Sequence, residues 1–305
     1  MTILVTGSDG LVGSALRELI SENVYFATRK DADLTSYQET EALFNKIKPE
    51  KVIHLAALVG GIGGNLMHSG EYFRDNLQIN INTLEAARKT NVKKLVSFMS
   101  TCVFPNEGPY PLTPNSLHLG QPHPSNFGYA YAKRMLEVQS RAYRAQWGLD
   151  YVVAIPTNIF GPRDNFNLIE GHVVPALIHK TYLAKKEKTN LTVWGSGKPL
   201  REFIYSKDVA KITLWMLDNY SDSDPLILTS GTETSIRDLV DYVVREMDYS
   251  GEINFDETKP DGQFRKPSSN DALLARFPNF SFTNLYDGVK ETVEWFNGNY
   301  PSIRK

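Results

Sequence analysis

The sequence predicts an α/β fold: a doubly wound parallel sheet covered by helices on both faces, followed by a smaller C-terminal α/β region. Over about the first 160 residues, short apolar runs alternate with longer amphipathic stretches, a pattern typical of parallel sheets with crossover helices. The short runs are apolar at every position, as expected for strands buried on both faces. After Pro156, proline and glycine recur and the alternation weakens, which predicts the second region.

The expected elements can be placed along the chain in order. We expect strands over residues 3–5, 24–27, 51–56, 95–98 and 151–155, and helices over residues 11–20, 36–47, 72–89 and 129–147. Ser36 is a candidate N-cap, with Glu39 three positions later. A further strand and helix over residues 203–219 are expected to return to the sheet. The predicted division places residues 1–157 and about 203–222 in the sheet domain, and about 158–202 and 223–305 in the smaller domain.

Composition and charge exclude several classes of protein. The 305 residues carry 33 Lys and Arg against 35 Asp and Glu, a formal net charge of −2, so the basic footprint of a nucleic-acid binder is missing. No run reaches the roughly 18 apolar residues that cross a membrane, and the first residues lack the pattern of a signal peptide. Cys102 is the single cysteine, so no internal disulfide can form. We therefore expect a cytoplasmic protein that binds neither nucleic acid nor membrane, and we expect no bound metal.

A glycine-rich loop follows the first strand and opens the first helix. Its sequence is Gly7-Ser8-Asp9-Gly10-Leu11-Val12-Gly13. In this position glycines allow a tight turn, a close backbone approach to a pyrophosphate and close packing of the helix, whose N-terminus attracts the phosphates. We expect all seven residues to bind a dinucleotide on a Rossmann-type sheet. The G-x-x-G-x-x-G spacing resembles the short-chain dehydrogenase/reductase superfamily, particularly its extended branch, which acts on nucleotide sugars.

The end of the second strand indicates which dinucleotide is bound. NAD-specific sites place a carboxylate there for the ribose 2′-hydroxyl, whereas this chain has Arg29 followed by Lys30. A guanidinium can form paired charge-assisted hydrogen bonds with a 2′-phosphate, so we predict NADPH as the cofactor. Near the adenine and along the dinucleotide we expect Asp33, Leu34, Ala56 and Ala57.

A Tyr-x-x-x-Lys pattern lies on the predicted helix 129–147. Tyr129 and Lys133 share a face because residues four apart on a helix point together. A tyrosine has an ordinary pKa of about 10, and we expect the lysine ammonium to lower it; Lys133 can also hold the cofactor. Ser100 stands at the end of the fourth strand, where we expect it to hydrogen-bond a substrate carbonyl beside Tyr129. The preceding Phe98 and Met99 are assigned to the cofactor site.

Cys102 follows Ser100 by two positions. On an extended segment, side chains at i and i+2 point to the same side, so Cys102 is a candidate catalytic thiol. A lone cysteine is more often a small buried apolar residue, and the residues by themselves leave both interpretations open.

Several motifs, in the same order along nearly the whole chain, resemble one family. Besides Ser100-x-Cys102 and the Tyr-x-x-x-Lys pair, they are Pro156-Thr157-Asn158-Ile159, His172-Val173-Val174-Pro175-Ala176, Trp194-Gly195-Ser196-Gly197 with Arg201-Glu202-Phe203, and Lys259-Pro260-Asp261-Gly262 with Arg265-Lys266. Together they are similar to the GDP-L-fucose synthases. These enzymes are NADPH-dependent epimerase–reductases that act on GDP-4-keto-6-deoxy-D-mannose.

The resemblance implies a role for each matching residue. Cys102 and His172 match the acid–base pair for epimerisation at carbons 3 and 5. Tyr129, Lys133 and Ser100 match the residues for reduction at carbon 4 and for the cofactor. The nicotinamide end is implied to contact Pro156, Thr157, Asn158, Ile159 and His172.

Further residues are implied to contact a GDP-sugar substrate. They are Lys180, Trp194, Arg201, Asp261 and Lys266. Lys180 stands where the family's bacterial members carry an arginine, and a lysine is a point charge rather than a fork, so one phosphate contact is expected to differ. Members of the superfamily commonly dimerise through two long helices, and by that analogy we expect a homodimer through residues 72–89 and 129–147.

Two other kinds of function stay open. One is a non-reducing nucleotide-sugar epimerase or dehydratase. A dehydratase is expected to carry an acidic pair after the strand-end serine, where this chain has Thr101-Cys102, and a GDP-mannose epimerase recycles NAD⁺, which conflicts with Arg29. The other is a catalytically silent NADP(H)-binding regulator, which the presence of all five candidate catalytic residues disfavours.

Overall fold

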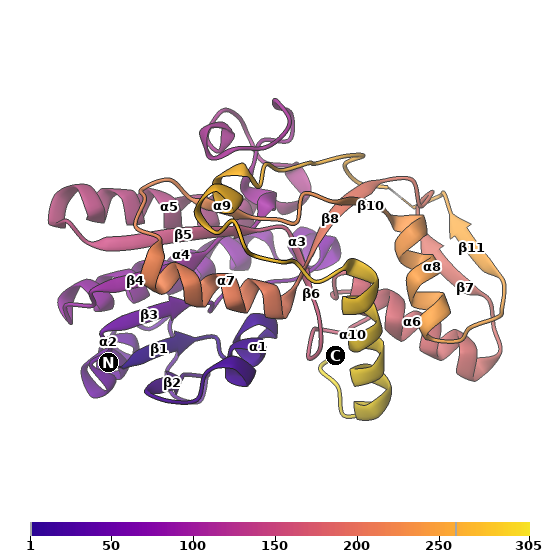
Figure 1. The fold of residues 1–305 in the computed structure, drawn as a ribbon, viewed down its shortest axis with the longest axis horizontal. Coiled ribbons are helices and arrows are strands. Elements are labelled where there is room, and N and C mark those ends of the chain that lie inside the picture. The colour runs from indigo at the N-terminus through magenta and orange to yellow at the C-terminus, as the bar shows by residue number, and fades with distance from the viewer. Residues whose placement is uncertain (1, 260) are drawn as a thin grey trace.

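A six-stranded sheet is the centre of the computed structural model, which describes residues 2–259 and 261–305. Its strands are β1 (Ile3–Thr6), β2 (Val24–Phe26), β3 (Lys51–His54), β4 (Lys94–Phe98), β5 (Asp150–Pro156) and β9 (Leu226–Leu228). They lie in the order β2-β1-β3-β4-β5-β9, and every neighbouring pair is parallel. The predicted doubly wound parallel sheet is confirmed (Figure 1).

Helices cover both faces of this sheet (Figure 1). α2 (Tyr37–Ile47), α4 (Ser69–Lys89) and α5 (Phe127–Trp147) cover one face, and α1 (Leu11–Leu19) and α7 (Ser206–Asn219) cover the other. Successive side chains of a strand point to opposite faces. In β1, Leu4 therefore packs into the core under α2 and α4, while Val5 packs into the core under α1 and α7.

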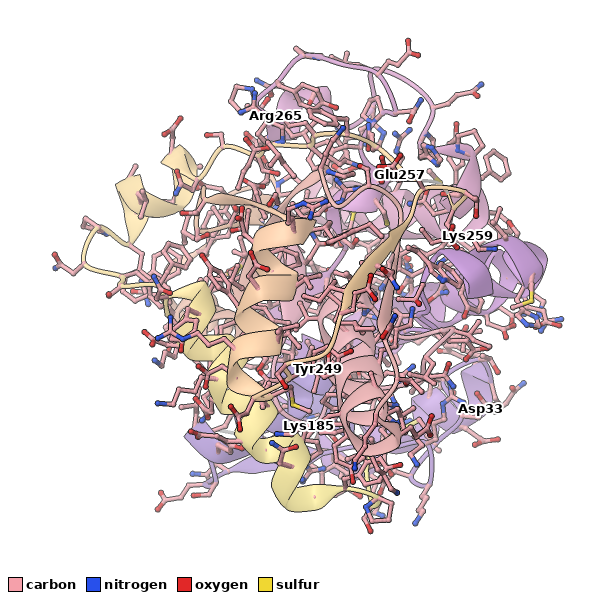
Figure 2. All side chains as sticks on the ribbon, turned by 90° about the vertical axis from the view of Figure 1, so that its right-hand side faces the viewer. Asp33, Lys185, Tyr249, Glu257, Lys259 and Arg265 are labelled. Carbon is pink, nitrogen blue, oxygen red and sulfur yellow. The ribbon has the colours of Figure 1, made fainter. Side chains whose placement is uncertain are left out.

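The C-terminal region has a third core of its own. β6 (Asn158–Phe160), β8 (Leu200–Tyr205) and β10 (Glu233–Ser235) form a small sheet, and β7 (Leu191–Trp194) pairs with β11 (Ile253–Asp256). α6 (Val173–Glu187), α8 (Ile236–Glu246) and α10 (Leu285–Asn299) pack against these strands. Figure 2 looks onto this end of the molecule: Lys185 and Tyr249 lie near one end of the β7–β11 pair, and Glu257 and Lys259 lie near the other.

Shorter elements connect these parts. They are α3 (Ile62–Met67), α9 (Asp271–Arg276) and the single-turn 3₁₀ helices η1 (Thr101–Val103), η2 (Pro114–Ser116) and η3 (Pro124–Asn126). The predicted cap of α2 is confirmed, since Ser36 Oγ accepts from the Glu39 N–H at 3.4 Å. In the part of the chain that is described, the helices are not both long and apolar enough to cross a membrane.

Two expected placements near the domain boundary are wrong. The strand expected within residues 203–219 is β8, which pairs with β6 and β10 in the small sheet; its helix, α7, does pack on the large sheet. The second and third residues of β8 are the polar Arg201 and Glu202, which do not suit a strand buried on both faces. β9 joins the large sheet although residues 223–305 were assigned to the smaller domain. Its three residues are all apolar and buried, which favours a place between two helical layers.

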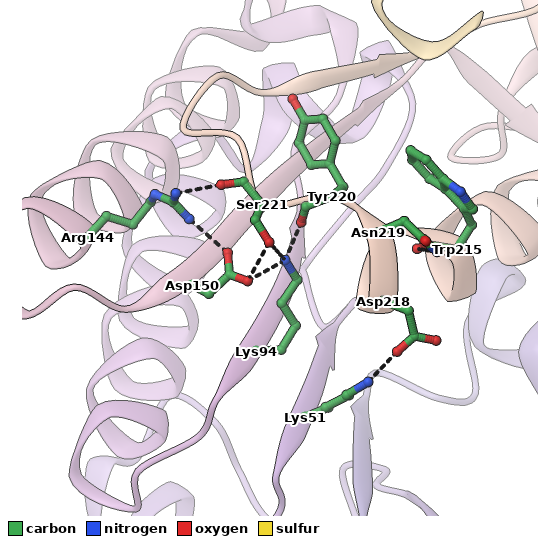
Figure 3. A network of polar contacts seen from close by, with 9 residues as sticks. All are labelled: Lys51, Lys94, Arg144, Asp150, Trp215, Asp218, Asn219, Tyr220 and Ser221. Carbon is green, nitrogen blue, oxygen red and sulfur yellow. Dashed lines mark hydrogen bonds and ion pairs between the residues drawn. The ribbon is translucent and has the colours of Figure 1, made fainter. Parts of the chain in front are cut away.

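The amino ends of β4 and β5 carry a network of polar contacts (Figure 3). Lys94 donates to Asp150 Oδ2 at 2.8 Å, to Ser221 Oγ at 3.3 Å and to the Tyr220 carbonyl oxygen. Asp150 also accepts from Arg144 Nη1 at 2.9 Å. The network ties α5 and both strands to the segment after α7, and it closes the edge of the sheet opposite to the candidate site.

Candidate active site

A cavity of about 1620 Å³ runs along the carboxyl ends of the parallel strands. It spans the point between β1 and β3 where the strand order reverses, which is the usual ligand position in an open α/β sheet. One wall comes from the loops that follow β1, β2, β3, β4 and β5. The opposite wall comes from the C-terminal region, including the start of β8 and residues 262–266. The two regions therefore build the cavity together.

The glycine-rich loop forms one end of this cavity. Gly7 has a φ of 67°, and a Cβ there would lie 2.6 Å from Ala56 N; a Cβ on Gly13 would lie 2.5 Å from the Ser8 carbonyl oxygen. Larger residues are therefore excluded at both positions. Gly10 precedes α1, and because it has no side-chain acceptor, the first N–H groups of the helix are left to a phosphate. The loop fits a dinucleotide.

Ser8 is the one loop residue that does not line the cavity. Its side chain is buried and accepts from Arg17 Nη2 at 2.8 Å, and its N–H donates to the Ala27 carbonyl oxygen at 3.2 Å. Ser8 thus ties α1 to the end of β2, which departs from its predicted place beside the cofactor. The other predicted loop residues line the cavity, namely Gly7, Asp9, Gly10, Leu11, Val12 and Gly13.

Arg29 and Lys30 line the cavity after β2, and both are exposed. The nearby carboxylate of Asp31 is held inside the turn, where it accepts from the Tyr25 hydroxyl at 2.6 Å and from the Thr28 N–H at 2.8 Å. These bonds lower the pKa of Asp31. The two cations are left facing the cavity, as a 2′-phosphate would require. The cavity lining also includes Asp33, Leu34, Ala56 and Ala57.

Tyr129 and Lys133 lie one turn apart on α5 and both line the cavity. Lys133 Nζ donates to the Phe98 carbonyl oxygen at 2.9 Å and lies 6.0 Å from the centre of the Tyr129 ring. Burial lowers the pKa of Lys133 to about 8 and raises the pKa of Tyr129 well above its ordinary value. The expected lowering of the Tyr129 pKa is therefore wrong, because removing the phenolate from water outweighs an ammonium at this distance.

Ser100 and Cys102 meet at the turn η1. Ser100 Oγ donates to Cys102 Sγ, 3.2 Å away, and accepts from the Cys102 N–H at 3.3 Å. The segment is a 3₁₀ turn rather than the extended chain that was expected, yet the two side chains still lie together. Burial raises the pKa of the thiol, and this rise is opposed by the Ser100 bond and by the charges of Lys266 and Lys133.

His172 reaches the same cavity from the C-terminal region. It precedes α6, its side chain is exposed, and it lines the cavity as Cys102 does. The structure thus brings the five predicted catalytic residues to one cavity from the end of β4, from α5 and from the start of α6. Other predicted cofactor residues on the lining are Phe98, Met99, Pro156, Thr157, Asn158 and Ile159.

The residues expected to contact a GDP-sugar fall into two groups. Arg201 and Lys266 line the cavity. Burial lowers the pKa of both side chains, that of Lys266 to about 8. Lys180, Trp194 and Asp261 lie outside the lining, so the structure does not place them with the reactive residues.

This second group sits where β7 ends. Lys180 Nζ lies 4.8 Å from the centre of the Trp194 ring, and Trp194 is 56% exposed. Asp261 accepts from the Ser196 N–H at 2.6 Å and from the Ser196 hydroxyl at 2.8 Å. The Asp261 carboxylate also acts to raise the pKa of Arg201. The second group therefore interacts electrostatically with the first.

Comparison with known proteins identifies the family. Residues 3–228 match the NAD dependent epimerase/dehydratase family. A GDP-L-fucose synthase of Dictyostelium discoideum is 47% identical over 312 residues, covering 100% of this chain and 98% of the relative. A probable GDP-L-fucose synthase of Drosophila melanogaster is 42% identical and covers 99% of both chains. The chain belongs to the GDP-L-fucose synthase family.

A solved structure within the GDP-L-fucose synthase family shares this fold. It is a GDP-L-fucose synthetase from Naegleria fowleri bound to NADP, with a TM-score of 0.94 and 42% identity, covering 100% of this chain and 95% of that chain. The match includes both regions, so the two proteins share the arrangement of the sheet and the C-terminal region.

In this GDP-L-fucose synthase family member, a buried polar chain behind the site was not predicted from the sequence. His54 contacts Thr6 Oγ1 at 2.8 Å and Asn80 Oδ1 at 3.2 Å, and Asn80 Nδ2 donates to the Ala132 carbonyl oxygen at 3.4 Å. Burial lowers the pKa of His54 to about 3, so its ring is neutral. The chain fixes α5 against β1 and β3. The sequence signal for this polar chain is the pair Asn76 and Asn80, which lie four apart on α4. Two amides on a buried helix face need hydrogen-bond partners.

Proposed function

We propose that this protein converts GDP-4-dehydro-6-deoxy-D-mannose to GDP-L-fucose, with NADPH as the reductant. The observation that carries the proposal is one cavity lined by Ser100, Cys102, Tyr129, Lys133 and His172. The same cavity extends to the dinucleotide loop, so a ketone held beside these residues lies toward a reduced nicotinamide. Relatives that match along the whole chain support the proposal: the synthase of D. discoideum and the NADP-bound synthetase of N. fowleri.

The cofactor residues that we propose form a continuous wall. The glycine-rich loop holds the pyrophosphate, Arg29 pairs with the 2′-phosphate, and Lys133 holds the nicotinamide ribose. NADPH, when bound, supplies the hydride that reduces the ketone. The rest of the wall is assigned to Asp33, Leu34, Ala56, Ala57, Phe98, Met99, Pro156, Thr157, Asn158, Ile159 and His172.

Epimerisation needs acid–base groups on two faces of the sugar ring. The carbon 4 ketone acidifies the protons on carbons 3 and 5, because the enolate places its charge on oxygen. One group removes a proton and a group on the opposite face returns one, which inverts the centre. We assign this exchange to Cys102, at the end of β4, and His172, at the start of α6. Ser100 and Tyr129 donate hydrogen bonds to the enolate oxygen.

Reduction at carbon 4 uses the tyrosine as proton donor. Tyr129 is buried with a raised pKa, so it holds its proton until the developing alkoxide accepts it. The Lys133 ammonium, 6.0 Å from the ring, offsets the charge left on the phenolate. The raised pKa of Tyr129 therefore suits a group that donates its proton in this step.

The nucleotide part of the substrate is assigned to two cations on the cavity lining and to the surface beyond it. Arg201 and Lys266 are half-buried cations without a carboxylate bond among the described residues, which suits the diphosphate. Trp194 offers an exposed ring for the base, with Lys180 beside it. Asp261, which acts electrostatically on Arg201, is assigned to the same surface.

Product analysis tests the proposed function. The protein is incubated with GDP-4-dehydro-6-deoxy-D-mannose and NADPH, and the absorbance of NADPH and the identity of the sugar are followed. We expect NADPH to be consumed and GDP-L-fucose to form. Unchanged NADPH would reject the proposal. A reduced sugar with unaltered carbons 3 and 5 would instead identify a nucleotide-sugar reductase without epimerase activity.

We also propose that the protein is a cytoplasmic homodimer that pairs through α4 and α5. These helices pack together, and their outer faces carry exposed apolar side chains, including Phe73, Ile81, Phe127 and Met135. A patch of this kind on a folded protein is typical of an interface. Light scattering should give twice the mass of the chain, and replacing Ile81 and Met135 by lysine should give the monomer.

A further inference from the structure

Asp164 is a buried carboxylate in the wall of the active-site cavity to which the reaction has assigned no role. It lies in the loop after β6, is 4% exposed, and lines the cavity. Its Oδ1 accepts from the Asn165 N–H at 2.7 Å. Its Oδ2 is buried and finds no hydrogen-bond partner among the residues described. A buried carboxylate oxygen without a partner costs stability, and groups of this kind concentrate at functional sites.

Two charged or titratable groups face this carboxylate. They are His172, from the start of α6, and Arg304, from the segment after α10; burial raises the pKa of Asp164 to about 6, and both groups oppose that rise. The Arg304 carbonyl oxygen accepts from the Phe166 N–H at 2.9 Å, which holds that segment against the Asp164 loop. Glu170 also lines the cavity near His172, but it is exposed.

His172 lies on the same cavity lining as this carboxylate and is not bonded to it in the structure. Its side chain is exposed, and in the described residues no ion pair within 4.0 Å joins it to Asp164. An exposed side chain changes rotamer at little cost. An acid–base imidazole needs a second group that fixes its orientation and tautomer, and Asp164 Oδ2 is a buried acceptor on the same cavity wall.

We propose that Asp164 is the positioning residue for His172: its free Oδ2 accepts the imidazole N–H, orients the ring toward the sugar and favours the imidazolium form. The part of this inference that concerns catalysis rests on the proposed function. The pairing itself does not, because it is a property of two side chains. A nearby carboxylate stabilises the positive imidazolium, and the test measures this effect.

The test compares two buried aspartates. Asp164→Asn keeps the shape and the Asn165 bond but removes the charge. Asp208 is the matched control, since it is 0% exposed, lies off the cavity lining and has both oxygens bonded, to the Thr283 N–H at 2.7 Å and the Thr283 hydroxyl at 3.0 Å. The His172 ring is titrated by NMR in each protein, with its signals assigned from His172→Gln. We expect the midpoint to fall by about one pH unit in Asp164→Asn and to stay in Asp208→Asn.

Catalysis gives a second readout. In heavy water, Asp164→Asn should incorporate deuterium at carbons 3 and 5 about tenfold more slowly, with the acid side of its pH profile displaced in the same direction as the His172 midpoint. Oxidation of GDP-L-fucose by NADP⁺, which does not need epimerisation, should slow by a smaller factor.

An unchanged His172 midpoint in folded Asp164→Asn overturns the proposal. If that variant does not fold, the reciprocal one decides: in His172→Gln, whose altered side chain is exposed, the Asp164 carboxyl should titrate at higher pH than in the wild type, and an unmoved titration overturns the pairing. These titrations need no substrate. A wild-type protein that fails to turn over the GDP-sugar but shows the coupled titration therefore rejects the proposed function and retains the pairing.

Discussion

Two buried lysines at opposite edges of the same sheet have different surroundings. Lys94 is 5% exposed and lies at the amino edge, the side of the sheet where the amino ends of the strands meet. Lys133 is 2% exposed and lies at the carboxyl edge, where their carboxyl ends meet. Lys94 bonds the Asp150 carboxylate at 2.8 Å, which itself accepts from Arg144 (Figure 3). Lys133 bonds a backbone carbonyl, and in the part of the chain described here it has no carboxylate partner. Burial lowers the pKa of each, but Asp150 acts against this at Lys94.

The difference separates a structural edge from a reactive one. At the amino edge, the buried cation is neutralised, and the network joins segments distant in sequence. At the carboxyl edge, Lys133 and Asp164 are buried and Lys266 is half-buried, and none of the three has a directly bonded opposite charge among the described residues. Unpaired buried charges cost stability, so we infer that they are kept for the cofactor and substrate that they meet there.

The largest expected effect comes from removing the unpaired lysine. Lys133→Met should lower kcat/KM for NADPH oxidation by about 10³-fold, because it removes both a cofactor contact and the charge beside Tyr129. Its free energy of unfolding should not fall, since a buried charge without a counter-ion is lost. Steady-state kinetics and urea unfolding measure the two quantities. If Lys133→Met were much less stable than the wild type, Lys133 would be a structural residue like Lys94, and the two edges would not differ in role.

The pH dependence of this variant sharpens the comparison. The unfolded chain keeps the lysine proton up to about pH 10.5, whereas the folded chain releases it near pH 8. The cost of burying Lys133 is thus fully present below pH 8 and is lost as the pH rises toward 10.5. The stability of the wild type should approach that of Lys133→Met over this range. A difference that stays constant with pH would show that folding does not change the pKa of Lys133.

The paired lysine should show the opposite result. Lys94→Met leaves the Asp150 carboxylate with one cation fewer, and we expect the free energy of unfolding to fall by about 3 kcal/mol with kcat/KM little changed. Urea unfolding checks the first part. Adding Asp150→Asn to this variant should recover part of the loss, because the two residues act as a pair. Loss of activity without loss of stability would contradict the structural role of this edge.

A smaller effect, on the choice of cofactor, is expected from replacing Arg29, an exposed cation on the cavity lining. Arg29→Ala should reduce the preference for NADPH over NADH by about tenfold, because one charge-assisted pair with the 2′-phosphate is lost. The ratio of kcat/KM for the two cofactors measures it, and the KM for the GDP-sugar serves as the control. If the preference is unaltered, the 2′-phosphate is bound by other residues.

The parallel sheet and the cofactor loop were predictable because their signals are local. Apolar runs specify buried strands, and the spacing of Gly7, Gly10 and Gly13 follows from the backbone turn that they build. The i, i+4 relation of Tyr129 and Lys133 is fixed by the helix itself. Each of these features depends on residues that are neighbours in the chain, so the sequence carries them directly.

The features that were missed depend on packing between distant segments. Burial of Tyr129 reverses the expected direction of its pKa, and burial cannot be read from the Tyr-x-x-x-Lys spacing. Ser8 turns inward because Arg17 and Ala27 offer it partners. β9 joins the large sheet across about 70 residues of intervening chain. Asp164 becomes notable only because its loop folds against the cavity and leaves one oxygen unbonded.

Deuterium entry at the sugar ring tests the central claim most directly. Wild type and Cys102→Ser are incubated with GDP-4-dehydro-6-deoxy-D-mannose and NADPH in heavy water, and the label at carbons 3 and 5 is read by NMR or mass spectrometry. The wild type should carry deuterium at both carbons of the GDP-L-fucose formed, and Cys102→Ser should incorporate it far more slowly while remaining folded. Wild-type exchange rates in Cys102→Ser would remove the thiol from the mechanism and contradict the assignment of this cavity.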